Sequence, residues 1–157
     1  MLLRPVILLI ALELFALKVQ AADAVLAVIV AQDFANKEPS AKELNLIYRK
    51  KILSWNDGSR IHPVNLPSDH PLRKVFSMAV LKSLPESQAP YWNDLYYHGI
   101  SPPYVFPSYE AVIRFVIETK GSIAYLSACN LDERVRPVLW IDTSGNITNN
   151  KPDFICN

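Results

Sequence analysis

Hydrophobic and polar residues follow one another along this chain in blocks that predict a small domain of mixed helices and strands. Ala24 to Ala31 is a continuous apolar run with several β-branched residues, so it predicts a central strand buried on both faces. Arg60 to Leu66, Ile123 to Leu126 and Val135 to Ile141 predict further, shorter strands. The turn signal Asp57-Gly58 separates the first of these from the helical pattern before it.

Helical patterns lie between the predicted strands, and each carries its own start or stop signal. Ser40 is followed by Glu43 three residues later, which predicts a capping box and a helix that continues to about Arg49. Ser68 or Asp69 is placed to cap the next helix. Two more helices are predicted, from Leu84 to Gly99 and from Ser108 to Thr119. Helices that alternate with short apolar strands indicate an α/β layered domain.

The first residues have the pattern of a secretory signal peptide. Arg4 precedes an apolar stretch from Val6 to Leu17, and Val19-Gln20-Ala21 places small residues where a signal peptidase cleaves. A stretch of about 12 residues is too short for a membrane span, which needs roughly 20. We therefore expect a signal peptide at 1–21, one domain at 22–157, a periplasmic or secreted location and no stable membrane span after cleavage.

Charge and motifs exclude several classes of function. The full chain has 16 Lys and Arg against 15 Asp and Glu, and removal of Arg4, Glu13 and Lys18 leaves 14 of each. A nearly neutral domain has no clustered basic excess of the kind that binds nucleic acid. We find no catalytic motif and no histidine at metal-ligand spacing, so we expect neither an enzyme nor a metal or other cofactor.

Two cysteines, Cys129 and Cys156, follow the predicted cleavage site. An oxidising compartment would allow them a single intramolecular pairing, which predicts a disulfide that holds the end of the chain. Two separate buried thiols are the alternative.

Four segments carry a family likeness to phosphate-type periplasmic solute-binding proteins. The motifs that resemble this family are Ile47 to Gly58, which reads IYRKKILSWNDG, then Arg73 to Phe76, Tyr91-Trp92-Asn93 with Gly99, and Gly121 to Leu126. The resemblance implies an α/β domain that is a single lobe of the type II periplasmic-binding-protein-like fold, with a mixed central sheet and helices on both faces. Full-length members have two such lobes around a ligand, and this chain is long enough for one.

The resemblance also implies a ligand-binding half-site. Its residues would be Ser68, Asp69, His70 and Arg73 at a helix start, with Ser122 and Tyr125 on the neighbouring strand, holding a small oxyanion such as phosphate. Aligned on Arg73, the Ser-Gly-Thr anion loop of the family becomes His70-Pro71-Leu72. Aligned on Ser68, it keeps one hydroxyl but gains the carboxylate of Asp69. Either register weakens an anion site.

Two functions follow from these patterns. The first is a periplasmic solute-binding-type domain, related to phosphate-transport substrate-binding proteins, that binds an oxyanion. The second is a non-transport module that binds an envelope protein or a second copy of itself. The family motifs favour the first, whereas the altered anion loop and the missing second lobe favour the second. Tyr97, Tyr104 and Phe106 flank Pro102-Pro103 and would suit a partner surface if exposed.

Overall fold

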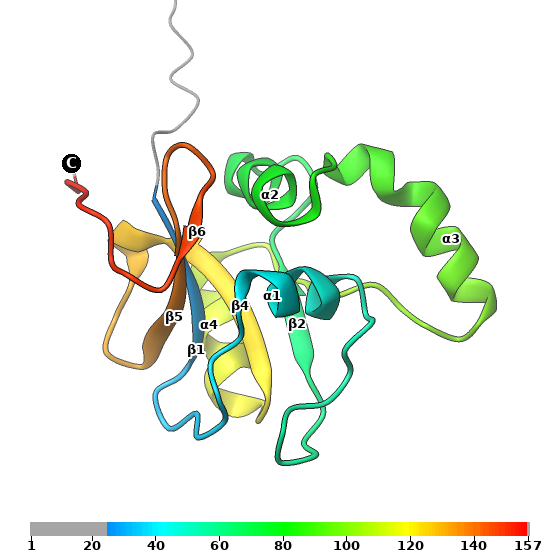
Figure 1. The fold of residues 1–157 in the computed structure, drawn as a ribbon, viewed down its shortest axis with the longest axis horizontal. Coiled ribbons are helices and arrows are strands. Elements are labelled where there is room, and N and C mark those ends of the chain that lie inside the picture. The colour runs from blue at the N-terminus through cyan, green and yellow to red at the C-terminus, as the bar shows by residue number, and fades with distance from the viewer. Residues whose placement is uncertain (1–24, 157) are drawn as a thin grey trace, which may run out of the picture.

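The computed structural model describes residues 25–156 and shows a mixed sheet of six strands with helices packed on both faces (Figure 1). The strands are β1 (Leu26–Ala31), β2 (His62–Asn65), β3 (Tyr104–Val105), β4 (Ser122–Ser127), β5 (Val135–Ile141) and β6 (Ile147–Thr148). Their order across the sheet is β3-β2-β4-β1-β5-β6. β2 runs parallel to β3 and β4, whereas β1 is antiparallel to β4 and β5.

The helices divide between the two faces of this sheet. They are α1 (Ala41–Tyr48), α2 (Pro71–Phe76) with a π-helical continuation η1 (Ser77–Leu81), the 3-10 turn η2 (Pro85–Gln88), α3 (Ala89–Tyr97), α4 (Tyr109–Glu118) and the 3-10 turn η3 (Ala128–Asn130). In Figure 1, α1 lies in front of the strands and α4 behind them. The α/β class, the mixed central sheet and the helices on both faces are therefore confirmed.

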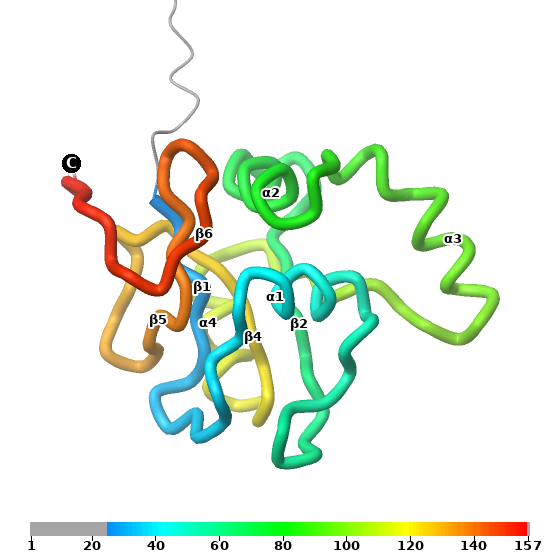
Figure 2. The backbone as a smooth tube through the Cα atoms, in the orientation of Figure 1, coloured from blue at the N-terminus to red at the C-terminus, as the bar shows by residue number. Residues whose placement is uncertain are grey.

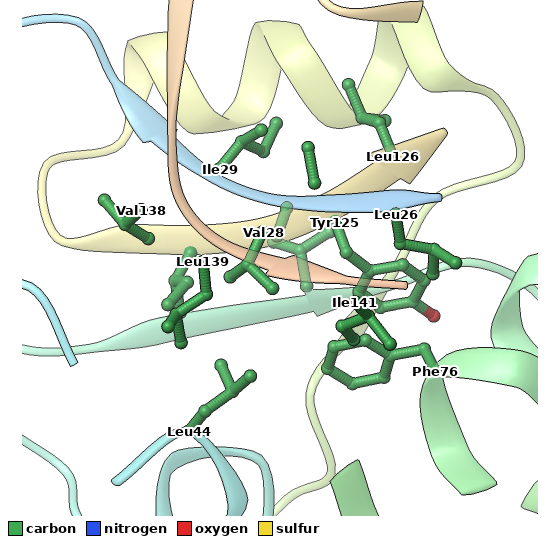
Figure 3. Packing of buried hydrophobic residues seen from close by; sticks show 14 of the residues in the cluster. Leu26, Val28, Ile29, Leu44, Phe76, Tyr125, Leu126, Val138, Leu139 and Ile141 are labelled. Carbon is green, nitrogen blue, oxygen red and sulfur yellow. The ribbon is translucent and has the colours of Figure 1, made fainter. Parts of the chain in front are cut away.

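The core is built on β1, as its uninterrupted apolar sequence predicts. Residues 25–30 are all buried, because β4 and β5 flank β1 and a helix covers each face. Figure 3 shows Ile29 and Leu126 on the face toward α4, and Val28 and Leu139 on the opposite face, toward Leu44 of α1. This alternation along the strands divides the core into two layers.

Two of the three predicted helix caps are confirmed and one is wrong. Ser40 accepts the N–H of Glu43 and the Glu43 carboxylate accepts the N–H of Ser40, which is the expected capping box. Ser108 caps α4 as predicted. The second helix is capped by His70, not by Ser68 or Asp69. Pro71 fits the first helical position, where a missing N–H costs nothing, so the helix starts later than predicted.

Three features of the second half depart from the sequence prediction. The connector after α3 contributes the short edge strand β3, and the polar tail contributes β6. The predicted helix between Leu84 and Gly99 begins with a 3-10 turn. Its α-helical part, α3, has no buried residue and stands away from the sheet (Figure 2).

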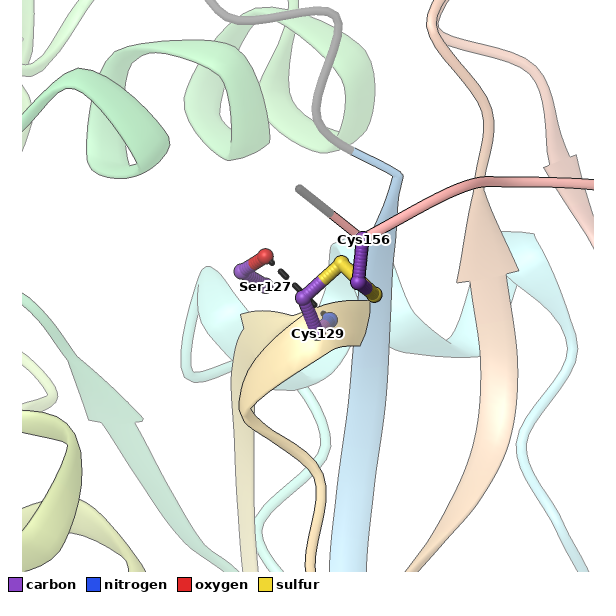
Figure 4. The surroundings of a disulfide bond; sticks show 3 residues. All are labelled: Ser127, Cys129 and Cys156. Carbon is purple, nitrogen blue, oxygen red and sulfur yellow. Dashed lines mark hydrogen bonds between the residues drawn. A yellow bond between two sulfur atoms is a disulfide. The ribbon is translucent and has the colours of Figure 1, made fainter.

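A disulfide joins Cys129 to Cys156, which confirms the predicted pairing (Figure 4). Cys129 follows β4, and its N–H donates to Ser127 Oγ at 3.4 Å. The bond therefore holds the C-terminal tail against the 3-10 turn that follows β4. The predicted signal peptide lies outside the described residues. Within residues 25–156, no helix has the length and apolar character needed to cross a membrane.

Candidate functional site

The predicted ligand residues that follow β2 form the start of α2. Ser68 and Asp69 lie in an exposed turn. His70 Nδ1 accepts the N–H of Leu72 at 3.2 Å, and Pro71 has no N–H to offer. The His70 side chain therefore uses one backbone donor and the Pro71 ring removes another, so the start of α2 presents few free backbone donors to an oxyanion.

Arg73 is the residue of this group with an unusual environment. It is 8% exposed, and its Nε and Nη1 atoms are shielded from solvent without a hydrogen-bond partner in the described part of the chain. No ion pair of residues 25–156 includes it. Burial lowers the pKa of the guanidinium, although Tyr125 and Tyr48 oppose this effect. Arg73 is thus a largely desolvated cation without a counter-ion, which is an unfavourable arrangement by itself.

The surroundings of Arg73 are aromatic. Phe76 stacks on Tyr125, with ring centroids 3.8 Å apart, and its centroid lies 4.5 Å from that of Tyr48. Burial raises the pKa of both phenols, so both are neutral at physiological pH. These rings form a low-dielectric wall in which a charge–charge interaction is strengthened.

The two phenols are held by β2. Tyr48 donates to the carbonyl oxygen of Val64 at 2.9 Å. Tyr125 donates to Asn65 Oδ1 and accepts the N–H of Leu66, both at 3.3 Å. The phenols are therefore already satisfied within the protein, whereas Arg73 is not. This difference makes Arg73 the group at this end of β2 whose hydrogen-bonding capacity is unused within residues 25–156.

Tyr125 and Ser122 do not lie together, although both were predicted on the neighbouring strand. Ser122 pairs with His62 at the beginning of β2, while Tyr125 contacts Asn65 at its end. Residues three apart in a strand also point to opposite faces, a signal that the sequence alone carries. Ser122 is buried with an unpartnered hydroxyl, but in another part of the domain. Tyr125 therefore lies close enough to Arg73 to affect its pKa, whereas Ser122 lies at the other end of β2.

Sequence reasoning missed Ser77. It is fully buried four residues after Arg73 in the continuation of α2, and its Oγ has no partner within residues 25–156. The available signal was a lone hydroxyl between the apolar helix positions Phe76 and Ala79–Val80. Such an atom is a second unsatisfied polar group on the same helical segment.

Metal ligation has no support in the part of the chain that the structure describes. No group of three or more His, Cys, Asp or Glu side chains there is arranged to hold a metal ion. Its two cysteines are both in the disulfide.

Comparison with known proteins shows a likeness at the level of the fold. No family model matches the sequence, and no curated protein is significantly similar to it. A solved phosphate-transport receptor of the ABC type from Vibrio cholerae aligns with a TM-score of 0.58 and 18% identity, over 73% of this chain and 46% of the receptor. A phosphate-bound protein from Clostridium perfringens, assigned to phosphate ABC transport, gives the same TM-score and identity over 73% and 44%.

PstS from Borrelia burgdorferi aligns with a TM-score of 0.52 and 16% identity, over 68% of this chain and 42% of its own. The chain thus spans less than half the length of these solved structures. Its fold is that of the periplasmic binding proteins, and it represents a single lobe of that fold.

Proposed function

We propose that this chain is a periplasmic or secreted solute-binding-type protein of one lobe, not an enzyme, that binds a small oxyanion such as phosphate at Arg73. The observation that carries the proposal is the desolvated guanidinium of Arg73, which has two unpartnered N–H groups and no carboxylate partner in residues 25–156. A bound oxyanion would supply the missing counter-charge and accept a charge-assisted hydrogen bond from the guanidinium.

Two further observations support this proposal. The fold is similar to that of two phosphate-transport proteins, one of them solved with phosphate bound. The disulfide supports an oxidising compartment, since such bonds persist outside the cytosol. The remaining predicted ligands contribute less. Ser68 and Asp69 are exposed, and the Asp69 carboxylate would repel an anion at close range.

Calorimetric titration of the purified, disulfide-bonded protein with phosphate, sulfate and arsenate tests the proposal. We expect saturable heat with at least one of these anions. The heat should disappear in Arg73→Met and persist in Lys74→Met, because Lys74 is the exposed cation next to Arg73 on the same helix. No heat with any of the three anions, or equal heat in Arg73→Met, would overturn the assignment.

A second function, binding of an envelope protein or of another copy of this chain, is favoured by one specific observation. The α3 helix stands away from the sheet and exposes Tyr96 and Tyr97, which are 71% and 87% accessible. Phe106 instead packs on Phe115, so the predicted surface is only partly available. Light scattering of the wild type and of Tyr97→Ser would show whether α3 mediates self-association, and a monomer at all concentrations would exclude the homodimer.

A further inference from the structure

A cavity lies at the opposite end of β2 from Arg73. It has a volume of about 510 Å³ and is enclosed by the loop after α1, the beginning of β2 and the connector between α3 and β3. This volume is within the range of about 300–1,000 Å³ that is usual for small-molecule sites. We call it the basic groove, and its lining residues on which the argument depends are Lys50, Leu53, Arg60, His62, Ser101 and Tyr104.

The charges of the basic groove are all of one sign. Lys50, Arg60 and His62 line it, and no carboxylate does. Within residues 25–156, none of these three side chains belongs to an ion pair. Burial lowers the pKa of Lys50 and of His62, and the charge of Arg60 lowers both further. Lys50 and Arg60 therefore lie close enough to repel one another, and an anion would relieve that repulsion. His62, whose pKa lies below its usual value, adds a neutral ring at physiological pH.

Lys50 also has a backbone conformation that is unusual for a residue with a side chain. It follows α1 in a left-handed conformation, with φ at +56°, and its N–H donates to the carbonyl oxygen of Ile47 at 2.9 Å. The next N–H, of Lys51, donates to Leu46 at 2.8 Å. This is the Schellman termination, whose left-handed residue is usually glycine because a Cβ is strained there. Lys50 lines the basic groove, so its side chain can contact a ligand there.

Apolar side chains also line the groove. Leu53 and Tyr104 are 48% and 46% exposed although both are large hydrophobic residues, and the Tyr104 ring lies 5.9 Å from that of His62. Ser101 adds one hydroxyl group. The groove thus combines the cations Lys50 and Arg60 with apolar side chains and neutral hydroxyl groups, which suits an anion with an apolar body.

We propose that the basic groove binds a phosphomonoester whose phosphate lies among Lys50, Arg60 and His62 and whose apolar substituent contacts Tyr104. A dianionic phosphate matches the two cations Lys50 and Arg60 better than a carboxylate does. This ligand could be a free organic phosphate or a phosphomonoester lipid headgroup. The site is independent of Arg73 and goes beyond the proposed oxyanion function.

Calorimetry with phenyl phosphate, compared with inorganic phosphate, tests the groove. We expect phenyl phosphate to bind the wild type at least tenfold more tightly than inorganic phosphate at this site, because the ring adds the contact with Tyr104. Affinity for phenyl phosphate should fall at least tenfold in Lys50→Gly and in Arg60→Gln. No binding of phenyl phosphate, or unchanged affinity in Lys50→Gly, would overturn the proposal.

Lys82 provides a matched control. It has the same φ of +56°, is exposed and does not line the groove. Lys50→Gly and Lys82→Gly should therefore raise Tm by similar amounts through relief of the same backbone strain, while only Lys50→Gly loses phenyl phosphate. Once both variants show this rise in Tm, loss of binding in Lys50→Gly cannot be attributed to misfolding. Equal loss of affinity in both would refute the assignment.

Two further experiments separate a lipid headgroup from a free ligand and the groove from Arg73. The first is sedimentation with phosphatidylcholine vesicles that contain phosphatidic acid. Vesicle binding that depends on Lys50 assigns a lipid headgroup, whereas binding of phenyl phosphate without vesicle binding assigns a free organic phosphate. Arg73→Met should leave phenyl phosphate binding unchanged. If inorganic phosphate is lost in Lys50→Gly but retained in Arg73→Met, the Arg73 proposal fails while the groove stands.

Discussion

Gly121, the residue directly before β4, lies against the backbone of Arg60, and its replacement by alanine gives a prediction that Gly58 can control. A Cβ at this position would lie 2.2 Å from the carbonyl oxygen of Arg60, which is a backbone atom. The residue also has φ at +83°, a conformation that favours glycine. Gly121→Ala therefore combines a backbone clash with left-handed strain.

Gly58 separates the two effects. Its φ is +81°, nearly identical to that of Gly121, but nothing lies within 4 Å of the position a Cβ would take. Gly58→Ala should cost about 1–2 kcal/mol of unfolding free energy, which is the cost of the left-handed conformation for a residue with a side chain. Gly121→Ala should cost about 1–3 kcal/mol more, as crowding in a closely packed region does.

The clash should also reach the basic groove. The carbonyl oxygen of Gly121 accepts Trp55 Nε1–H at 2.9 Å and the N–H of His62 at 3.1 Å. Any shift that relieves the contact with Arg60 moves these hydrogen bonds and the position of His62. We therefore expect Gly121→Ala, and not Gly58→Ala, to weaken binding of phenyl phosphate.

Urea unfolding followed by tryptophan fluorescence measures the loss of unfolding free energy. The dependence of that free energy on urea concentration should be the same in both variants, as a two-state transition requires. The informative quantity is the difference between the two variants, because the conformational cost is common to both. Equal losses of stability in Gly58→Ala and Gly121→Ala would show that β4 and Arg60 are not in close contact, and would refute the reasoning.

Two other predictions concern the disulfide and the buried phenols. Cys129 and Cys156 are 27 residues apart, so replacing both with serine should lower the unfolding free energy by about 3.5 kcal/mol in the loop-entropy model. Urea midpoints of the oxidised wild type and the double variant test this, and a loss below about 1 kcal/mol would mean that the loop is already constrained when unfolded. Burial raises the pKa of Tyr48 and Tyr125, so their contribution to stability is complete below the unfolded value of about 10 and declines as pH rises above it. Tm measured from pH 8 to 11 should fall above pH 10, and less steeply in Tyr125→Phe; a flat profile would contradict the burial of these phenols.

Features that depend only on neighbouring residues or on composition were predictable from the sequence. The run of apolar residues in β1 needs burial on both faces whatever surrounds it, and the capping box at Ser40 is completed by Glu43 alone. The disulfide followed from there being only two cysteines in the predicted mature chain. Such features depend on residues a few positions apart or on composition, so a single sequence is enough to specify them.

Features that depend on long-range pairing were not predictable. β3 and β6 have two residues each and exist because a neighbouring strand offers hydrogen-bond partners. The register between β2 and β4 places Ser122 beside His62, and no local pattern specifies that register. The basic groove likewise combines Lys50, Arg60 and the connector after α3, three segments that only the fold brings together. The part of the candidate site that sequence reasoning did identify, Arg73, lies in one short helix.

Arg73 offers a final prediction, which concerns stability. If its guanidinium is desolvated without a partner, as the structure shows for Nε and Nη1, the unliganded protein carries a cost that methionine of similar length would remove. Arg73→Met should then raise the unfolding free energy by about 1–4 kcal/mol, the range seen when buried ionic groups are replaced by apolar ones. Lys74→Met, at the exposed neighbour, should change it by less than about 0.5 kcal/mol. A loss of more than about 1 kcal/mol in Arg73→Met, measured by urea unfolding without anion, would mean that the protein itself satisfies the charge. A gain in stability together with loss of phosphate binding is the combination expected of a residue kept for a ligand, because only the ligand compensates the cost of burying it.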